Sequence, residues 1–565
     1  MDEKILIKFT NFTFRYHSLA KPSLENINLE INSGDKVLIV GRSGSGKSTL
    51  LHAINGIIPF ANYGETSGSL IINGNDDIND SIFSRSKVVG TILQDMDSQF
   101  IGLSVGEDVA FSLENEQIDN ERIHATVKQS LEEVAMLDFI GHSPYELSGG
   151  QKQRVSLAGI LASSPEVLLF DEPLANLDPA SAVKITSLIK ELNHTTRKTV
   201  VIAEHRLEEC LEIEPDYIVV MDGGQIVKIA KPDEILASGI LNQLGIREPL
   251  YCELLKYSCL ETSVSKLADV IDLDNQKKQR IIDWFNSTYL AESLKKEIKE
   301  PPIFSARDIS FAYQDNFPTL KNISFDLHKG EIVSILGNNG AGKSTLTCLM
   351  SGIYSPRSGV MTLNGEDISS WTIKKRGQYI ALIMQNPNQM IVKTLVWDEV
   401  AFCLENQGVE LSQIKRRVEN TLRVCGLWGY RSWPISALSY GQKKRVTIAA
   451  MLVLEPEILI LDEPTAGQDL KTYREFMEFL QKLAASGLSI LIITHDLYLA
   501  MEYTSRTMVL MNGELIADKD PASILADDEI IRLAGLHELS PISLAKKLGL
   551  NPKAFLNKFL ACRER

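Results

Sequence analysis

Two segments of the chain, each rich in glycine and each ending in Gly-Lys-Ser-Thr, have the residue types that hold phosphate. "GRSGSGKST" spans residues 41–49, and "GNNGAGKST" spans residues 337–345. Both fit the pattern G-x-x-x-x-G-K-[ST], in which glycines let backbone N–H groups turn toward an anion. The lysine would reach the β- and γ-phosphates of a nucleotide, and the serine hydroxyl would bind Mg²⁺. The candidate residues are Gly41, Arg42, Ser43, Gly44, Ser45, Gly46, Lys47, Ser48 and Thr49, and Gly337, Asn338, Asn339, Gly340, Ala341, Gly342, Lys343, Ser344 and Thr345.

Acidic residues follow two apolar runs, "EVLLF" and "EILIL", and supply the other groups that phosphoryl transfer needs. Asp171 and Asp462 would hold Mg²⁺, directly or through water. Glu172 and Glu463 would polarise the attacking water. One such pair could simply end a strand before a proline. Two pairs in register with two phosphate-loop candidates make that interpretation weak.

The next apolar run in each half ends in histidine, as "VIAEH" at 201–205 and "LIITH" at 491–495. A lone histidine at a strand end is more often structural than catalytic. Its repetition at the same place favours a function for His205 and His495.

Between the loop and the acidic pair, each half carries a short helix-start motif, "LSGGQ" at 147–151 and "LSYGQ" at 438–442. The serine can act as N-cap, and the glycines leave backbone N–H groups open to an anion. A capped helix alone would explain the motif, but the phosphate-loop and acidic motifs in the same half favour a second anion site. The candidate residues are Ser148, Gly149, Gly150 and Gln151, and Ser439, Tyr440, Gly441 and Gln442.

These motifs belong to an internal repeat that extends along almost the whole chain. A strand, a glycine loop and an apolar-periodic helix recur in both halves, and the "EVLLF" and "EILIL" runs are typical of strands buried on both faces of a parallel sheet. Alternating stretches such as "GSLIINGND" predict antiparallel strands beside that sheet, so we expect α/β domains. The predicted boundaries are 1–245 for the first domain, 246–300 for a helical extension and linker, 301–535 for the second domain, and 536–565 for a helical tail.

Charge, cysteine spacing and apolar runs bear on the partners and the compartment of the protein. The net charge of −15 argues against a nucleic-acid partner held by general attraction. The seven cysteines have no metal-ligand spacing and are expected to be reduced thiols in a cytosolic protein. The N-terminus does not look like a signal peptide, and no apolar run approaches the length of a membrane span.

The order and spacing of these motifs resemble an ATP-binding-cassette (ABC) ATPase, present here in two copies over residues ~5–245 and ~303–535. The resemblance implies two P-loop cassettes, each with a parallel core sheet, an antiparallel β subdomain and a helical subdomain. It also implies ATP and Mg²⁺, with two ATP molecules held head-to-tail between the halves. Lys47 would then share its ATP with Ser439–Gln442, and Lys343 would share its ATP with Ser148–Gln151.

Further roles come from the same resemblance. Gln94 and Gln385 match the loop residue that binds Mg²⁺ and senses a membrane partner, and His205 and His495 match the switch histidine at the γ-phosphate. The other matches are Asp178 and Asp469 in the loop between sites, and Tyr16 and Tyr313 as the aromatic stacked on adenine. An aromatic residue on a strand is as often core, so the tyrosines stay open between the two roles.

The halves are not identical. Tyr440 stands where the first half has Gly149. Its ring could crowd the anion-facing backbone or strain a conformation that glycine tolerates. We expect both sites to hydrolyse ATP, with the Lys47 site slower. Arg206 follows the first histidine where the second half has Asp496, a departure that bears on the orientation of the first switch loop.

The stretches "DMDSQFIGLSVGEDVAFSLEN" and "NPNQMIVKTLVWDEVAFCLEN" resemble energy-coupling-factor transporters, the cobalt- and vitamin-importing branch. The resemblance implies a transmembrane coupling subunit and a substrate-binding membrane subunit as partners, at the cytoplasmic face of the cell membrane. An apolar face of Phe100, Ile101, Val109 and Phe111 would suit docking of a helix, although Val109 and Phe111 could equally pack on their own domain. A tandem ABC ATPase that acts on ribosomes is the alternative. The cargo is not readable from the sequence.

Overall fold

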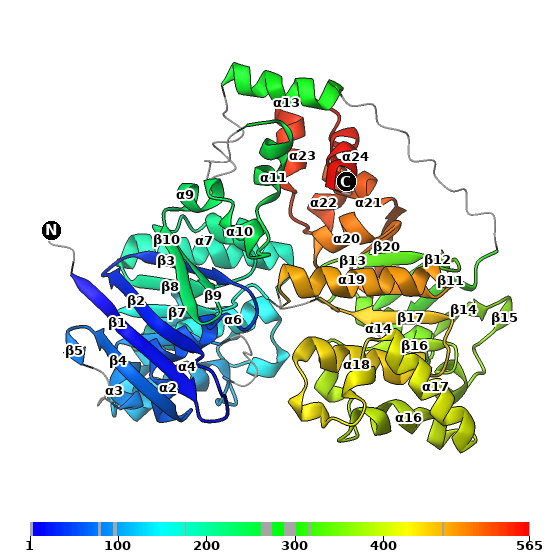
Figure 1. Cartoon of the computed structure of the whole chain (residues 1–565), viewed down its shortest axis with the longest axis horizontal. Coiled ribbons are helices and arrows are strands. Elements are labelled where there is room, and N and C mark those ends of the chain that lie inside the picture. The colour runs from blue at the N-terminus through cyan, green and yellow to red at the C-terminus, as the bar shows by residue number, and fades with distance from the viewer. Residues whose placement is uncertain are drawn as a thin grey trace. The chain divides into compact units, whose positions relative to one another are not determined.

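The computed structural model describes residues 4–76, 81–93, 99–175, 177–260, 274–287, 301–314, 318–465 and 468–563. The chain divides into two compact units. The first contains residues up to Ser287 together with Asp469–Lys471, and the second contains the rest. Figure 1 shows the first unit in blue to green and the second in green to red.

The first unit combines two sheets. One is antiparallel with strand order β2–β1–β4–β5, and the other has the order β10–β9–β3–β8–β7–β6, parallel except for β10. The strands are β1 Ile5–Tyr16, β2 Leu24–Asn32, β3 Lys36–Gly41, β4 Gly64–Ile72, β5 Asn75–Asp76, β6 Val89–Ile92, β7 Val167–Asp171, β8 Thr199–Ala203, β9 Tyr217–Asp222 and β10 Gln225–Ala230. The helices are α1 Lys47–Asn55, α2 Ile57–Phe60, α3 Ile82–Ser86, α4 Val105–Asn115, α5 Asn120–Glu133, α6 Gly149–Ala162, α7 Pro179–Thr196, α8 Leu207–Leu211, α9 Pro232–Ala237, α10 Ile240–Gln243, α11 Leu250–Tyr257 and α13 Asn275–Ser287.

The second unit repeats this topology, with sheet orders β12–β11–β14–β15 and β16–β17–β18–β13–β19–β20. Its strands are β11 Phe304–Phe311, β12 Leu320–Leu327, β13 Ile332–Leu336, β14 Ser358–Leu363, β15 Glu366–Asp367, β16 Ile380–Ile383, β17 Ile458–Asp462, β18 Ser489–Ile493, β19 Arg506–Met511 and β20 Glu514–Lys519. Its helices are α14 Lys343–Ser351, α15 Ile373–Arg376, α16 Val396–Asn406, α17 Leu411–Val424, α18 Tyr440–Leu452, α19 Leu470–Ala485, α20 Leu497–Tyr503, α21 Pro521–Leu525, α22 Asp528–Leu533, α23 Ser540–Lys547 and α24 Pro552–Arg563.

The continuous apolar runs become the central strands of each parallel sheet. β7 and β8 are buried at every residue, because layers cover both faces of a parallel sheet. In each unit one hydrophobic cluster joins the two sheets and the helix after the glycine loop, α1 or α14. The predicted α/β architecture with an added antiparallel sheet is confirmed.

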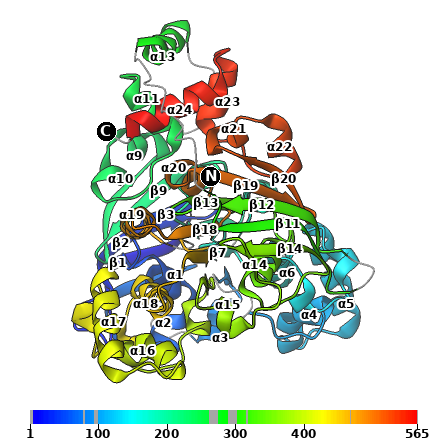
Figure 2. The same cartoon turned by 90° about the vertical axis from the view of Figure 1, so that its right-hand side faces the viewer.

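The predicted helical subdomain is also present. Helices α4, α5 and α6 pack together in the first unit, as α16, α17 and α18 do in the second. Figure 2 shows each group clustered at one end of its unit, the first in blue-cyan and the second in yellow. Residues 246–300, predicted to be helical, contain α11 and α13, and Tyr257 stacks on Trp284 with ring centroids 6.5 Å apart. The domain boundaries themselves stay a prediction. In the described ranges, no helix combines the length and apolarity needed to cross a bilayer.

A buried arginine closes the end of the helix that follows the second glycine loop. The side chain of Arg376 is 2% exposed. Its Nη1 donates to the carbonyl oxygen of Leu349 at 2.8 Å, and its Nη2 donates to that of Ile368 at 2.8 Å. The helix end thus acquires a donor that the α-helix itself does not supply.

Replacing Arg376 by alanine is expected to destabilise the second unit by about 3 kcal/mol, because two hydrogen bonds from a buried charged group are lost. The N–H groups of Gly352 and Trp371 still donate to the same two carbonyl oxygens. Calorimetric unfolding of the intact chain should show a transition at lower temperature. Arg416→Ala, at an exposed position of α17, is the control and should change stability by less than about 0.5 kcal/mol. Equal shifts for the two variants would contradict a capping role.

Candidate functional site

The first glycine loop joins the end of β3 to the start of α1. Gly46 is the N-cap of α1 with φ 101°, and a Cβ there would lie 2.7 Å from the carbonyl oxygen of Ser23. Glycine is therefore required at this position. Lys47 Nζ donates to the carbonyl oxygens of Gly41 and Arg42, at 3.0 and 3.2 Å. The ammonium group is thus folded over the loop, where an incoming phosphate would meet it.

The second glycine loop repeats this geometry between β13 and α14. Gly342 is the N-cap with φ 99°. Lys343 Nζ donates to the carbonyl oxygens of Gly337 and Asn338, at 2.7 and 2.9 Å. Both predicted loops therefore place their lysine in the same way.

The serine after each lysine meets the aspartate predicted to share its metal ion. Ser48 Oγ donates to Asp171 Oδ1 at 3.1 Å, and Ser344 Oγ donates to Asp462 Oδ2 at 3.3 Å. Burial raises the pKa of Asp171 to about 6 and also raises that of Asp462. A hydroxyl and a carboxylate are the hard oxygen ligands that Mg²⁺ takes, so these residues fit the ion.

The predicted glutamate and histidine also come together in each unit. His205 Nε2 lies 3.0 Å from Glu172 Oε1, and His495 Nε2 lies 3.4 Å from Glu463 Oε1. Burial, with a smaller contribution from Asp462, raises the pKa of Glu463 to about 8. A carboxyl group with a pKa near neutrality suits proton transfer.

Both glutamates have an unusual backbone. Glu172 has φ 49° and Glu463 has φ 43°, in the left-handed region that non-glycine residues seldom adopt. Their N–H groups donate to the carbonyl oxygens of Ala203 and Ile493, each at 2.9 Å. Strained residues held by their neighbours cluster at functional sites. The same strain at two equivalent positions supports a shared function for them.

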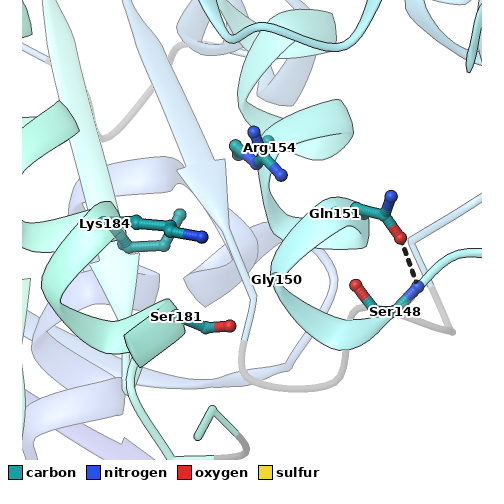
Figure 3. A pocket seen from close by; sticks show the side chains of 7 residues that line it. Ser148, Gly150, Gln151, Arg154, Ser181 and Lys184 are labelled. Atoms are coloured by element: carbon teal, nitrogen blue, oxygen red, sulfur yellow. Dashed lines mark hydrogen bonds between the residues drawn. The ribbon is translucent and has the colours of Figure 1, made fainter. Parts of the chain in front are cut away.

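The first helix-start motif lines a pocket of about 230 Å³ between α6 and α7. Ser148 is the N-cap of α6, and its N–H donates to Gln151 Oε1 at 2.9 Å. Figure 3 shows Arg154 of α6 and Lys184 of α7 at the same pocket. The open helix N-terminus and two cationic side chains make this pocket suited to an anion.

Comparison with known proteins decides the family. The family described as "ABC transporter" matches residues 24–175 and 320–466. An ABC transporter ATP-binding protein of Bacillus cereus strain ATCC 14579 is 46% identical over 557 residues, 98% of each chain. One of Clostridium perfringens strain 13 is 47% identical over 568 residues, 99% of each chain. The chain belongs to the ABC transporter family of ATP-binding proteins.

Two further matches concern the type of transporter. Residues 238–311 match the family described as "ATP-binding cassette cobalt transporter". The solved structure of cbiO1 from Clostridium perfringens, part of the ABC transporter complex cbiONQ, is 36% identical and has a TM-score of 0.39. That match covers 41% of this chain and 94% of the other. The two cassette matches, the cobalt-transporter match and the full-length relatives confirm the predicted tandem ABC ATPase of the energy-coupling-factor type, and ATPase activity as the class of reaction.

Tyr440 of this ABC ATPase differs from the expectation. It is the first residue of α18 and has helical backbone, so the predicted strain at a glycine position is wrong. A helix N-terminus accepts any residue with ordinary φ and ψ. The ring is 45% exposed, and its hydroxyl donates to the carbonyl oxygen of Gln385 at 3.1 Å. Tyr440 thus connects the LSYGQ motif to the Gln385 loop of the same unit.

The two tyrosines predicted to stack on adenine, Tyr16 and Tyr313, differ in their surroundings. Tyr16 packs edge-on against Phe14 with centroids 4.8 Å apart, and it borders the core of its unit. Tyr313 is 57% exposed and its hydroxyl lies 3.1 Å from Thr345 Oγ1, beside the second glycine loop. The adenine role is therefore better placed for Tyr313 than for Tyr16.

Four further predicted residues belong to the two glutamine loops and to the loops expected between the sites. Gln385 lies after β16 with an exposed side chain, whereas Gln94 lies outside the described residues. Asp178 caps α7, its Oδ1 accepting the Ser181 N–H at 2.9 Å. Asp469 is buried and immediately precedes α19.

Sequence reasoning missed two buried charges beside the catalytic candidates. Glu204, next to His205, is 2% exposed. Lys444 is fully buried, and its Nζ donates to the carbonyl oxygen of Glu463 at 2.9 Å. Burial lowers the pKa of Lys444 to about 8. The repeat could have revealed both charges, because each replaces an uncharged residue of the other half. Glu204 stands where the second half has Thr494, and Lys444 stands where the first half has Gln153.

Proposed function

We propose that this ABC ATPase energises the uptake of a vitamin or metal ion through a membrane-embedded partner of an energy-coupling-factor transporter. The observation that carries the proposal is the match of residues 238–311 to the "ATP-binding cassette cobalt transporter" family. That segment lies entirely between the two matched cassette regions. The match therefore supports a type of transporter in addition to the ATPase activity. Both a vitamin and a metal ion stay candidates for the cargo.

In the proposed reaction, Lys47 and Lys343 leave their loop carbonyl groups and bind the β- and γ-phosphates of ATP. Mg²⁺, when bound, would neutralise charge on the phosphate oxygens. Its ligands would be Ser48 with Asp171 in one site and Ser344 with Asp462 in the other, with Gln94 and Gln385 completing the two sets.

Glu172 and Glu463 are the proposed bases. Each carboxylate would orient the attacking water and accept its proton. Each lies beside the histidine that would contact the γ-phosphate. His205 and His495 would hold the glutamate carboxylate and the γ-phosphate in a fixed position relative to each other. Positioning of charge accounts for most of the catalysis of phosphoryl transfer.

We further propose that neither cassette completes its own site. The pocket at Ser148 and Gln151 offers an anion site without a phosphate loop of its own, and the family resemblance assigns it to the ATP held by Lys343. The LSYGQ motif at 438–442 would serve the ATP held by Lys47. Fusion of the cassettes raises their effective concentration for this pairing. ATP binding would close the halves, and product release would reopen them.

Docking of the membrane partner involves fewer residues than the sequence indicated. Phe100 and Val109 are 6% and 0% exposed, so their proposed place on a docking face is wrong. Val109 belongs to the buried apolar stripe of α4, and Phe100 is buried in the segment before that helix. Ile101 and Phe111 are 63% and 42% exposed, and Leu103 is 84% exposed. These three side chains are the proposed contact with a helix of the partner at the cytoplasmic face of the membrane.

Purification of the intact chain from solubilised membranes tests the proposal. We expect a small transmembrane protein to co-purify, and Ile101→Glu with Leu103→Glu to release it because charge enters an apolar contact. Val227→Glu, at a 49% exposed position of β10, is the matched control and should retain the partner. Co-sedimentation with ribosomes, with no membrane partner, would contradict the transporter function.

A further inference from the structure

The buried carboxylate of Glu204 holds the loop that carries His205. Glu204 Oε2 accepts the backbone N–H groups of His205 at 2.5 Å and Arg206 at 3.0 Å. A buried carboxylate is costly unless it is hydrogen-bonded, and these donors supply the bonds. Burial raises the pKa of Glu204, with the charge of Glu172 as the next cause.

The second oxygen of the same carboxylate reaches another loop. Glu204 Oε1 accepts the N–H of Leu174 at 2.8 Å, in the segment that follows β7 and Glu172. Arg206 Nη1 donates to the carbonyl oxygens of Leu174 and Leu177, at 3.0 and 3.4 Å. The two residues that flank His205 therefore hold both backbone polar groups of Leu174.

Arg206 is itself oriented from α8. Its Nε and Nη2 both donate to Glu209 Oε1, at 3.0 and 2.7 Å. This leaves Nη1 directed at the segment after β7. A planar guanidinium fixed on one edge positions its other donors with little freedom.

The second cassette has different chemistry at these positions. Thr494 Oγ1 accepts the N–H of Asp496 at 2.9 Å and donates to Glu463 Oε2 at 3.4 Å. Asp496 Oδ1 caps α20 by accepting the N–H groups of Tyr498 and Leu499. One hydroxyl oxygen cannot replace two carboxylate oxygens, and an ionised aspartate has no donor for a carbonyl group.

We propose that Glu204 and Arg206 are positioning residues. Together they form a clamp that joins the His205 loop to the segment after Glu172. The clamp sets the 3.0 Å approach of His205 to Glu172 before nucleotide arrives. The Lys47 site thereby has a pre-positioned histidine and glutamate, while the Lys343 site relies on Thr494 and Asp496. The inference rests on the roles proposed above for Glu172 and His205.

The test isolates one site at a time in the full chain. In a Glu463→Gln background, turnover comes from the Lys47 site. There, Glu204→Gln and Arg206→Asp are each expected to lower kcat by about 10-fold, with the KM for ATP changed by less than about 3-fold, because misplaced catalytic groups slow chemistry more than binding. Arg206→Lys should recover part of the rate, since its ammonium can still donate to Leu174.

Two comparisons separate positioning from loss of folding. The same variants in a Glu172→Gln background should lose at least about 5-fold less activity than in the Glu463→Gln background. Lys190→Ala, which removes a surface ion pair with Glu214, should leave kcat unchanged. Unchanged kcat for the two clamp variants, or equal losses in both backgrounds, would overturn the clamp. If the Glu172→Gln, Glu463→Gln double variant still hydrolyses ATP, the proposed glutamate roles fail and the clamp fails with them.

Discussion

Glutamine at both Glu172 and Glu463 is expected to lower ATP turnover by about 10²–10⁴-fold while ATP still binds. An amide has nearly the size of the carboxylate but cannot accept the proton of the attacking water. Both side chains lie beside a histidine, at 3.0 and 3.4 Å, so the change removes the base without emptying the site. Single-turnover hydrolysis and binding of a fluorescent ATP analogue would measure the two effects separately.

Glu166→Gln is the matched control for this experiment. Glu166 immediately precedes β7, at the opposite end of the strand from Glu172, and is exposed. Turnover in that variant should equal that of the parent chain. Turnover in the double variant close to that of the control would exclude the two glutamates as bases.

The single variants test the inequality of the two sites. We expect Glu463→Gln to lose more activity than Glu172→Gln, because the remaining Lys47 site would be completed by the LSYGQ motif. This expected difference does not come from backbone strain, because Tyr440 has helical backbone. It comes from the Tyr440 side chain, whose hydroxyl donates to the carbonyl oxygen of Gln385. Equal losses would remove the asymmetry.

Replacing Lys47 and Lys343 by alanine is expected to weaken ATP binding by about 10–100-fold at each site, because charge-assisted bonds to phosphate are lost. Both lysines donate to carbonyl groups of their own loop, and Lys47 Nζ also lies 3.2 Å from His205 Nε2. Equilibrium titration with a fluorescent ATP analogue measures the loss.

The matched control for the lysines is Lys8→Ala, which removes an exposed ion pair with Glu30 on the antiparallel sheet. A surface pair of this kind contributes little to stability, so ATP affinity should be unchanged. Wild-type affinity in the Lys47→Ala, Lys343→Ala variant would mean that the glycine loops bind phosphate by backbone groups alone.

Local sequence determined the main parts of each candidate site. A glycine loop between a strand and a helix places its lysine in one way, as Lys47 and Lys343 show. Apolar runs predicted the buried strands β7 and β17, and residues directly after such strands meet at one edge of a parallel sheet. This is why Asp171 reaches Ser48 and Glu172 reaches His205.

Only the tertiary structure decided which side chains are buried and which atoms meet across loops. The spacing of Phe100 and Val109 allowed a docking face, yet both are buried, Val109 on the apolar stripe of α4 and Phe100 in the segment before that helix. Residue type did not show that Glu204 would leave solvent to bond with Leu174, or that Lys444 would lie fully buried behind Glu463. Burial of a charge depends on donors and acceptors brought from distant segments, and no local pattern specifies those.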